Sequence, residues 1–399
     1  MARILDCWEL GNGLAYIEGL ALGARLMGKA GHEVLFAGRD LTHAERLLGG
    51  RIKYYQAPTQ VIPVNTPLPA PMTFADVLIN LGYGNPDGVV ARVRAWRNLM
   101  DHVKPDIIRC GHAPAALLAA RGTGIRTIVL GIGFIVPPNS SPLPLLRTWA
   151  KNTDPERMAA REQAVLAGMD RALDSIGAPR VASIGALYAE TDVRLLYTYP
   201  ELDEYGPRQD VRYMGNLQAA LGEAPAWPAA PGKRIFAYLE PFKPISLVLQ
   251  ALADTRQPVL VYMPHTPEEL LTRYAGTNVR ITDRPLNLMQ AATECDFGVN
   301  HGGHNIVATL LWAGKPQLTL PTLFPERVIG EKVATMGAGL VSQLQLQEIE
   351  QQLTRLLQDT GLADKARGFS QRVTGMSIEA GLKEFMACVE ALVKAGPKA

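Results

Sequence analysis

The sequence predicts an α/β protein made of two tandem Rossmann-like domains, and three observations support this fold class. The chain has 399 residues, whereas a single domain commonly has ~100–200 residues. Short apolar runs alternate with helical patterns in both halves, as they do in parallel βαβ units. A Pro- and Ala-rich stretch interrupts the chain near its middle, and the alternation then starts again. We therefore predict an N-terminal domain over 1–220, a linker over 221–233 and a C-terminal domain over 234–399.

The N-terminal half begins with a predicted strand, a turn containing Gly11, Asn12 and Gly13, and a helix that Gly31 terminates. Glycine just after the last apolar turn is a frequent helix end. The predicted strands are 3–8, 33–37, 106–110 and 125–130, and the predicted helices are 14–29 and 114–120. Two Pro-rich loops, 58–71 and 137–144, are long for crossovers, and long loops at strand ends are commonly functional.

The C-terminal half repeats the same architecture after the linker. Its predicted strands are 235–239, 259–262, 279–282, 297–300 and 317–320, with helical patterns between them. The last helix is predicted near 377–394, and it could pack either on its own domain or back on the first domain. Parallel sheets bind ligands at the carboxyl ends of their strands, so we expect residues that follow these strands to form the site.

Composition excludes several classes of protein. Apolar residues make up 47% of the chain and its formal net charge is +2, with no charge block, so neither a disordered chain nor a nucleic-acid binder is expected. The longest apolar stretch, 127–136, is far shorter than the ~20 residues of a membrane helix. Four dispersed cysteines form no C-x-x-C pair, and the N-terminus resembles no signal peptide, so we expect a cytoplasmic protein without a membrane span.

The most informative segment runs from Asp296 to Leu340. A strand is predicted to end at Asn300, and His301-Gly302-Gly303-His304-Asn305 then leads directly into a helix. Glycines at such a turn allow close approach to the backbone, and the helix N-terminus offers unpaired N–H groups with a positive dipole end. Together these features predict a diphosphate site that requires no metal, although an ordinary strand-to-helix turn has the same pattern.

The same segment resembles the donor-binding signature of the UDP-dependent glycosyltransferases of the GT-B fold, which include macrolide and flavonoid glycosyltransferases. The matching elements are the His-Gly-Gly-His-Asn run, Ala313-Gly314-Lys315-Pro316, Leu320-Pro321 and Gly337-Ala338-Gly339. Near the N-terminus, Ala30-Gly31-His32-Glu33-Val34 also corresponds to a family motif. The resemblance implies two Rossmann-like domains facing a cleft, an N-terminal domain for the acceptor and a C-terminal domain for the donor.

Several donor-binding residues follow from the resemblance. The diphosphate would contact His301, Gly302, Gly303, His304 and Asn305. The loop that encloses the base corresponds to Arg284, Pro285 and Leu286, where Arg284 replaces a frequent aromatic residue. The acid–Gln pair that binds the donor sugar is replaced by Pro325-Glu326, and Lys243 follows the first strand of this domain. A ribose-binding acid is replaced by Thr309, and a hydroxyl residue of the phosphate motif by Ile306. These departures put a standard UDP-hexose donor in doubt.

The general base is where the resemblance fails. The family places a His at the start of the first helix, and this chain has Tyr16 there, whose phenol is a poor base at neutral pH. His112 follows a predicted strand and is our first candidate for the base, and Glu9 is the second. His112 could instead cap the next helix. Gly11, Asn12 and Gly13 form the predicted acceptor-side loop.

The sequence thus predicts an inverting, metal-independent transfer of a sugar from a UDP- or dTDP-linked donor to a hydroxyl of a small apolar acceptor. No cofactor is expected, because there is no D-x-D motif and no ligand cluster with metal spacing. The alternatives are a non-catalytic nucleotide-sugar-binding or partner protein, and an epimerase or hydrolase on the same fold. The partial G-x-G-x-x-G match at 11–16 is weak evidence for a dinucleotide enzyme. The oligomeric state stays open.

Overall fold

A computed structural model describes residues 1–11, 14–59, 67–216 and 222–398 of the chain. The chain divides into two compact units. The first consists of Met1–Tyr197, Pro207–Met214 and Gly381–Ala399, and the second of Thr198–Gly206 and Gly215–Ala380. The described part of the predicted linker, 222–233, therefore belongs to the second unit.

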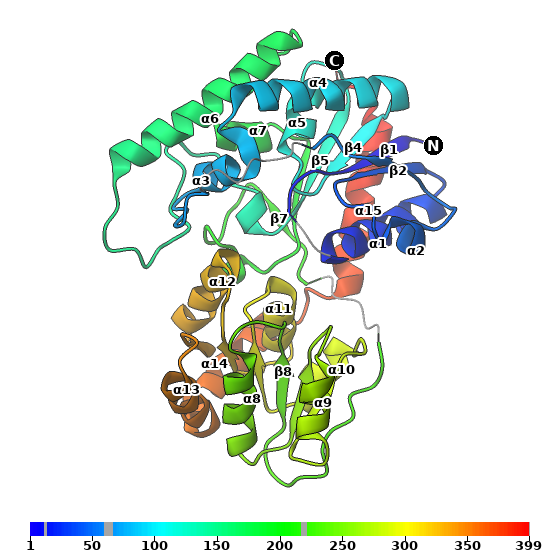
Figure 1. Cartoon of the computed structure of the whole chain (residues 1–399). Coiled ribbons are helices and arrows are strands. Elements are labelled where there is room, and N and C mark those ends of the chain that lie inside the picture. Colours follow the sequence, from blue (N-terminus) through cyan, green and yellow to red (C-terminus); the bar gives the residue numbers. More distant parts are fainter. Residues whose placement is uncertain (12–13, 60–66, 217–221, 399) are drawn as a thin grey trace. The chain divides into compact units, whose positions relative to one another are not determined.

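The first unit contains a seven-stranded parallel sheet in the order β3-β2-β1-β4-β5-β6-β7 (Figure 1). Its strands are β1 (Arg3–Trp8), β2 (Glu33–Gly38), β3 (Lys53–Gln56), β4 (Ile107–Cys110), β5 (Arg126–Gly131), β6 (Val193–Leu196) and β7 (Arg212–Tyr213). Its helices are α1 (Leu14–Lys29), α2 (Ala44–Leu48), α3 (Phe74–Leu78), α4 (Pro86–Val103), α5 (Pro114–Ala120), α6 (Pro155–Ser175), α7 (Ile184–Ala189) and, from Gly381 onward, α15 (Ile378–Ala395). A π-helical turn spans Ile79–Tyr83, and a short 3-10 turn spans Gly133–Ile135.

The second unit contains a six-stranded parallel sheet in the order β10-β9-β8-β11-β12-β13. Its strands are β8 (Ile235–Tyr238), β9 (Val259–Tyr262), β10 (Val279–Thr282), β11 (Phe297–Asn300), β12 (Gln317–Thr319) and β13 (Gly339–Val341). Its helices are α8 (Ile245–Asp254), α9 (Glu268–Tyr274), α10 (Leu288–Glu294), α11 (His304–Trp312), α12 (Phe324–Thr335), α13 (Leu346–Gln358) and α14 (Thr360–Arg372), with a 3-10 turn at Pro200–Leu202.

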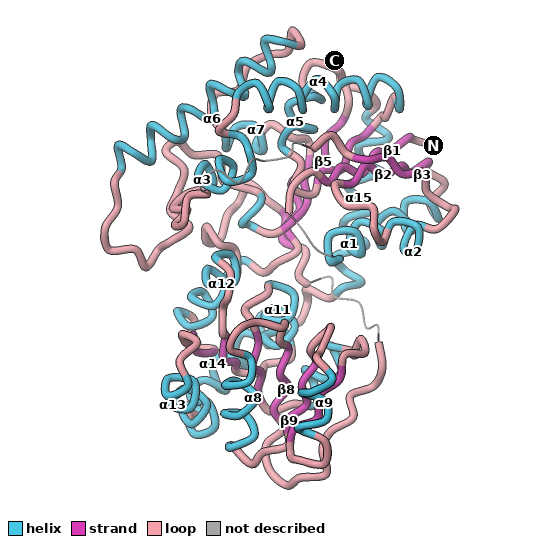
Figure 2. The backbone as a smooth tube through the Cα atoms, in the orientation of Figure 1, coloured by secondary structure: helices cyan, strands magenta, loops and turns pink. Residues whose placement is uncertain are grey.

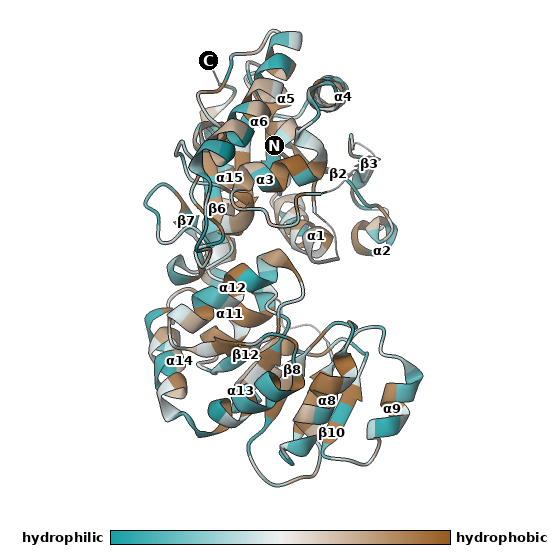
Figure 3. Cartoon of the chain, turned by 60° about the vertical axis from the view of Figure 1, so that its left-hand side comes forward, coloured by the Kyte–Doolittle hydropathy of each residue, from teal (hydrophilic) through white to brown (hydrophobic). Residues whose placement is uncertain are grey.

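Alternation along the strands of the second sheet builds a separate core on each face. Ile235 and Ala237 of β8 lie in one apolar cluster with α8 and α13. Phe236 lies in another cluster with α10 and α11, against which Tyr238 also packs. Successive side chains of a strand point to opposite faces, and both faces are covered by helices, so nearly every position of β8 is apolar. Figure 3 shows α8 mostly in brown, as its sequence ISLVLQALAD requires.

The predicted fold class is confirmed, and the helix or strand type of each predicted element is correct. Several boundaries differ by one residue: β5 begins at Arg126, one residue after the predicted start, and β12 ends at Thr319 rather than Leu320. Four strands were not predicted, namely β3, β6, β7 and β13. Three of them, β3 (KYYQ), β6 (VRLL) and β7 (RY), include charged or polar residues, so they do not form apolar runs. The fourth, β13, is the three-residue segment GLV. Figure 2 shows β3 beside β2.

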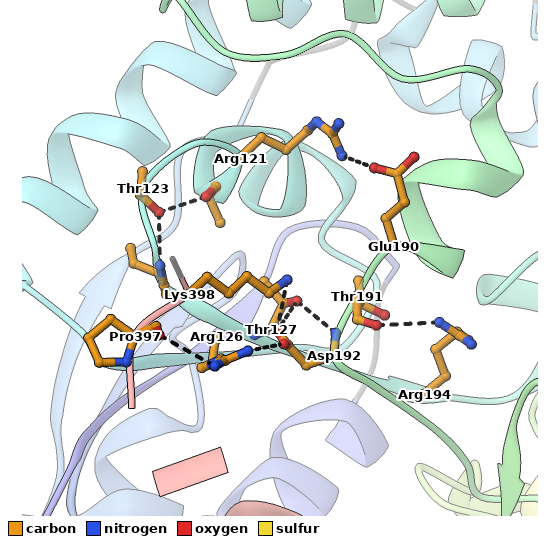
Figure 4. A network of polar contacts seen from close by, with 12 residues as sticks. Arg121, Thr123, Arg126, Thr127, Glu190, Thr191, Asp192, Arg194, Pro397 and Lys398 are labelled. Carbon is orange, nitrogen blue, oxygen red and sulfur yellow. Dashed lines mark hydrogen bonds and ion pairs between the residues drawn. The ribbon is translucent and has the colours of Figure 1, made fainter. Parts of the chain in front are cut away.

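The C-terminal tail is bound at the amino end of β5 in the first unit (Figure 4). Arg126 donates hydrogen bonds to the Gly396 carbonyl at 2.7 Å and to Asp192 at 2.8 Å. Lys398 pairs with Asp192 at 3.0 Å, and its backbone N–H donates to the Gly124 carbonyl at 2.8 Å. A cavity of about 480 Å³ lies beside this network. It is at the amino edge of the sheet, opposite the edge where parallel sheets bind ligands.

Among the described helices, none is long and apolar enough to cross a membrane.

Candidate functional site

The predicted phosphate turn joins β11 to α11 in the second unit. Asn300 is fully buried at the end of β11, and its side-chain oxygen accepts a hydrogen bond from the Gly302 N–H at 2.8 Å. Gly303 then takes the N-cap position of α11. The N–H groups of the first helical turn have no acceptor within the helix, so this end of α11 can bind an anion.

Both glycines of the turn are required by space. Gly302 has a φ of +91°, and a Cβ there would lie 2.7 Å from the Glu326 carbonyl oxygen. A Cβ on Gly303 would lie 2.4 Å from Nε2 of His301. A side chain at either position would displace the backbone or the His301 ring, so only glycines keep this surface open.

His301 lies between the phosphate turn and strand β8. Its ring is buried, and Nδ1 is 3.4 Å from the Tyr238 carbonyl oxygen, while the ring meets the Tyr238 ring edge-to-face at 5.3 Å. When Nδ1 carries the proton for this contact, Nε2 is left as the nitrogen beside Gly303. The geometry fits a histidine oriented by the backbone for contact with a ligand at the turn.

His304 and Asn305, the first residues of α11, differ in exposure. The His304 Nε2 atom is 2.7 Å from the Thr198 hydroxyl, and burial lowers the pKa of His304 to about 4. His304 is therefore neutral at neutral pH. The Asn305 side chain is exposed, and its backbone carbonyl accepts from Asn216 at 3.2 Å.

The side chain of Glu326 is committed to the start of α12. Its Oε2 accepts from the backbone N–H groups of Thr322 and Leu323, both at 2.8 Å, and the residue is buried. The residue that projects from this turn is instead Leu323, which is 60% exposed. The loop that the resemblance assigns to the donor sugar therefore presents an apolar side chain, and Glu326 holds the loop in shape.

The predicted base loop is attached to the residues that precede β8. Arg284 pairs with Glu223 at 3.4 Å between two largely exposed side chains, and the Glu223 N–H donates to the Pro285 carbonyl at 2.8 Å. Pro285 is exposed, whereas Leu286 is buried in the α10–α11 core. Lys243, in the loop after β8, is exposed. Arg284 and Pro285 are accessible to a ligand, and Leu286 anchors the loop.

The residue that replaces the ribose-binding acid is not accessible. Thr309 is fully buried, donates to the Asn305 carbonyl at 2.7 Å and accepts from Asn216 at 2.8 Å. Its hydroxyl thus serves the N-terminal turn of α11. A bound ribose must be held by other groups.

In the first unit, Glu9 follows β1, and both oxygens of its carboxylate accept hydrogen bonds from neighbouring elements. Its Oε1 accepts from Tyr83 at 2.8 Å and from Arg92 at 3.1 Å, and its Oε2 accepts from the Ala115 N–H at 2.9 Å in the first turn of α5. Burial raises the pKa of Glu9, and the Arg92 charge opposes this rise. With both oxygens engaged and the residue 1% exposed, this geometry favours a structural role for Glu9.

His112 follows β4 and is buried like Glu9, but its side chain differs from that of Glu9 in hydrogen bonding. Its backbone is left-handed, with a φ of +57°, and its carbonyl accepts from the Leu10 N–H at 3.0 Å. Both ring nitrogens are buried without a hydrogen-bond partner among the described residues, and the Phe74 ring lies 6.3 Å away. Burial lowers the pKa of His112 to about 3, and the Arg39 charge adds to this effect. Strained backbone and unpaired buried polar atoms are features that cluster at functional sites.

The predicted acceptor-side loop is described only in part. Gly11 has a φ of +85°, and its carbonyl accepts from Arg39 at 3.5 Å. Asn12 and Gly13 lie outside the described residues. Tyr16 lies in α1, and its side chain is likewise outside the described part of the chain.

Asn300 is a site residue that the sequence analysis did not single out. It orients the Gly302 N–H, and its own amide donates to Gln317 at 2.8 Å. The signal was present in the sequence, since a polar residue ends an otherwise apolar strand before a glycine turn. Within the described ranges, no group of three or more His, Cys, Asp or Glu side chains is arranged to hold a metal ion.

Residues 246–375 match a family model described as the C-terminal domain of the Erythromycin biosynthesis protein CIII-like proteins. The matched region contains the β11–α11 turn, the base loop and Glu326. No curated protein sequence gives a significant match.

Solved glycosyltransferase structures resemble the whole chain. The calicheamicin glycosyltransferase CalG4 has a TM-score of 0.71 at 17% identity, covering 98% of both chains. The spinosyn rhamnosyltransferase SpnG has 0.67 at 18% identity, covering 99% of this chain and 100% of its own. VinC, solved in complex with dTDP, has 0.67 at 16% identity, covering 98% and 100%. The predicted resemblance to the GT-B glycosyltransferases is confirmed for the fold, and residues 246–375 are similar to the C-terminal domain family named above.

Proposed function

Proceeding from this C-terminal family and the GT-B fold, we propose that the chain is an inverting, metal-independent glycosyltransferase. It takes a UDP- or dTDP-linked sugar as donor and a hydroxyl of a small apolar molecule as acceptor. The observation that carries the proposal is the β11–α11 turn. There the buried Asn300 orients the Gly302 N–H, and Gly302 and Gly303 leave the backbone before the helix N-terminus uncovered by side chains of their own. We assign the donor to the second unit and the acceptor to the first. Four buried free cysteines favour the cytoplasm as its compartment.

In this reaction the acceptor oxygen attacks the anomeric carbon, and the bond from that carbon to the diphosphate oxygen breaks. Negative charge develops on the leaving diphosphate, where the α11 N-terminus and His301 stabilise it. The acceptor proton passes to His112, whose two ring nitrogens have no other partner among the described residues. Because the pKa of His112 is about 3, its ring is neutral at pH 7 but weakly basic, so its contribution belongs at the lower end of general-base effects.

The sugar-facing loop bears on the donor. Glu326 is engaged by the Thr322 and Leu323 N–H groups, and Leu323 projects outward. An apolar side chain offers no hydrogen bonds to sugar hydroxyls, so this loop favours a donor sugar with fewer hydroxyls than glucose. This supports the expectation that the donor is not a standard UDP-hexose.

The test is incubation of the protein with a panel of UDP-, dTDP- and GDP-sugars, with and without a mixture of small hydroxylated aromatic acceptors. Transfer appears as a mass increase of the acceptor that requires both substrates. Donor consumption without acceptor indicates a hydrolase or epimerase, and binding without turnover indicates a non-catalytic nucleotide-sugar-binding protein. Either result rejects the proposal.

Metal independence is tested in the same assay. Transfer should continue at an unchanged rate in excess EDTA, because charge on the leaving diphosphate is neutralised by helix and side-chain groups. Loss of activity in EDTA, restored by Mg²⁺ or Mn²⁺, rejects this part of the proposal.

A further inference from the structure

Arg39 is a half-buried cation at the carboxyl edge of the first sheet. It follows β2, and its guanidinium donates a hydrogen bond to the Gly11 carbonyl at 3.5 Å. The neighbouring carboxylate, that of Asp40, instead accepts from the Thr42 N–H at 2.9 Å and from the Thr42 hydroxyl at 2.6 Å. Arg39 has no ion-pair partner among the described residues, so most of the five N–H donors of its guanidinium are available to a ligand.

The residues that follow β1 connect Arg39 with His112. Strand β1 lies between β2 and β4 in the sheet (Figure 1). The Leu10 N–H donates to the His112 carbonyl at 3.0 Å, and Gly11, the next residue, accepts from Arg39. Arg39 and His112 are thus attached to adjacent residues of one segment, at the edge where parallel sheets bind ligands. Burial is the main cause that lowers the pKa of His112, and the Arg39 charge acts on the ring in the same direction.

This arrangement limits which acceptor hydroxyls can react. Neither nitrogen of the His112 ring has a hydrogen-bond partner among the described residues, so the ring can receive the acceptor proton. With a pKa of about 3, however, His112 is a weak base. A phenol has a pKa of ~10, whereas a hydroxyl as weakly acidic as that of water has one of ~15.7. Proton transfer to His112 is therefore far less unfavourable from a phenol, and a cation beside the phenol oxygen favours it further.

We propose that Arg39 is a catalytic residue that binds the acceptor oxygen of a phenol and stabilises the negative charge developing on it. The inference rests on the proposed function, because it takes the first unit as the acceptor unit and His112 as the base. A phenol also meets the expectation of a small, largely apolar acceptor.

The transfer then proceeds without a further reactant. The phenol O–H proton passes to a ring nitrogen of His112, and an electron pair of the phenol oxygen forms the bond to the anomeric carbon. The bond from that carbon to the diphosphate oxygen breaks, and its electron pair leaves with the diphosphate. Negative charge on the phenol oxygen attracts both Arg39 and the protonated His112 ring, so it offsets the repulsion between these two cations.

The experiment measures kcat and KM for phenol, 4-methoxyphenol and 4-nitrophenol, with cyclohexanol as an aliphatic acceptor and the nucleotide sugar that the wild type uses as donor. Arg39→Met removes the charge but keeps a long side chain, and Arg39→Lys retains the charge. Arg25→Met is the matched control, because Arg25 is an exposed arginine near the end of α1 that leads to the amino end of β2. Urea unfolding verifies that each variant is folded, and UDP calorimetry verifies that its donor site is intact.

We expect Arg39→Met to lower kcat for phenol by roughly 10²–10³-fold, the effect of removing one donor to a developing oxyanion, and by less than ~10-fold for the more acidic 4-nitrophenol. Arg39→Lys should lose less than Arg39→Met, and Arg25→Met should match the wild type. UDP affinity should be the same in all variants.

A wild-type kcat for phenol in folded Arg39→Met overturns the inference. An equal loss for all three phenols also overturns it, because a structural role of Arg39 does not depend on the acidity of the acceptor. Transfer by the wild type to cyclohexanol and to none of the phenols rejects the inference while the proposed function stands. Transfer to no acceptor from any donor means that the proposed function itself fails.

Discussion

Replacing Gly302 by alanine tests the phosphate turn most directly. The residue has a φ of +91°, and the new Cβ would lie 2.7 Å from the Glu326 carbonyl oxygen. A left-handed backbone costs an L-residue ~1–2 kcal/mol, and overpacking against a rigid neighbour costs ~1–3 kcal/mol. We therefore expect Gly302→Ala to lower the free energy of unfolding by about 2–5 kcal/mol, a large part of a typical 5–15 kcal/mol.

Urea unfolding and UDP titration of the same samples separate the two effects of this change. If the turn relaxes to relieve the contact, the Gly302 N–H moves away from Asn300 and nucleotide affinity falls even where stability is retained. Gly368→Ala is the matched control, because Gly368 lies inside α14 with the nearest atom to an added Cβ 3.8 Å away. Alanine there should stabilise the helix by ~0.5–1 kcal/mol. Wild-type stability together with wild-type UDP affinity in Gly302→Ala would refute the reasoning.

Three further predictions concern the histidines and Glu9. His301→Ala should weaken UDP binding by roughly 10- to 150-fold, as loss of one charge-assisted hydrogen bond implies, and unchanged affinity by calorimetry contradicts this. His112→Ala should lower kcat about 10²-fold at constant donor affinity, whereas Glu9→Gln should mainly lower stability; a normal rate in the former with a lost rate in folded Glu9→Gln transfers the role to Glu9. The pKa of His112 is about 3 and that of His304 about 4 in the folded chain, both below 6.5. The unfolded state thus binds more protons than the folded state between pH 6.5 and 4. Lowering the pH through this range should therefore decrease the free energy of unfolding by ~1.4 kcal/mol per pH unit for each ring. In His112→Ala, the free energy of unfolding measured by urea titration should change less steeply with pH than in the wild type. An identical pH dependence contradicts the lowered pKa of His112.

Local pattern in the sequence was sufficient to predict the architecture and the strand-to-helix turn at 300–305. Buried parallel strands are short apolar runs, and helices carry their own periodicity, so β1, β8 and β11 were predicted to within one residue. The positive φ angles of Gly11 and Gly302 likewise depend on the local residue type, since glycine adopts a positive φ without strain. These features depend on residues that are close together in the chain.

The roles of individual site residues were decided by contacts across the fold. The Glu9 carboxylate accepts hydrogen bonds from Tyr83 and Arg92, which are 74 and 83 residues away, and no local pattern in the sequence indicates these contacts. Thr309 is enclosed by Asn216, 93 residues away, and the Tyr238–Tyr262 stack follows from the register of β8 and β9. Periodicity encodes which side of an element is buried but not which distant group it meets. The sequence by itself therefore determined the layout and the strand-to-helix turn at 300–305. Only the tertiary structure decided which polar groups are paired internally and which, like the buried His112 ring nitrogens, have no hydrogen-bond partner among the described residues.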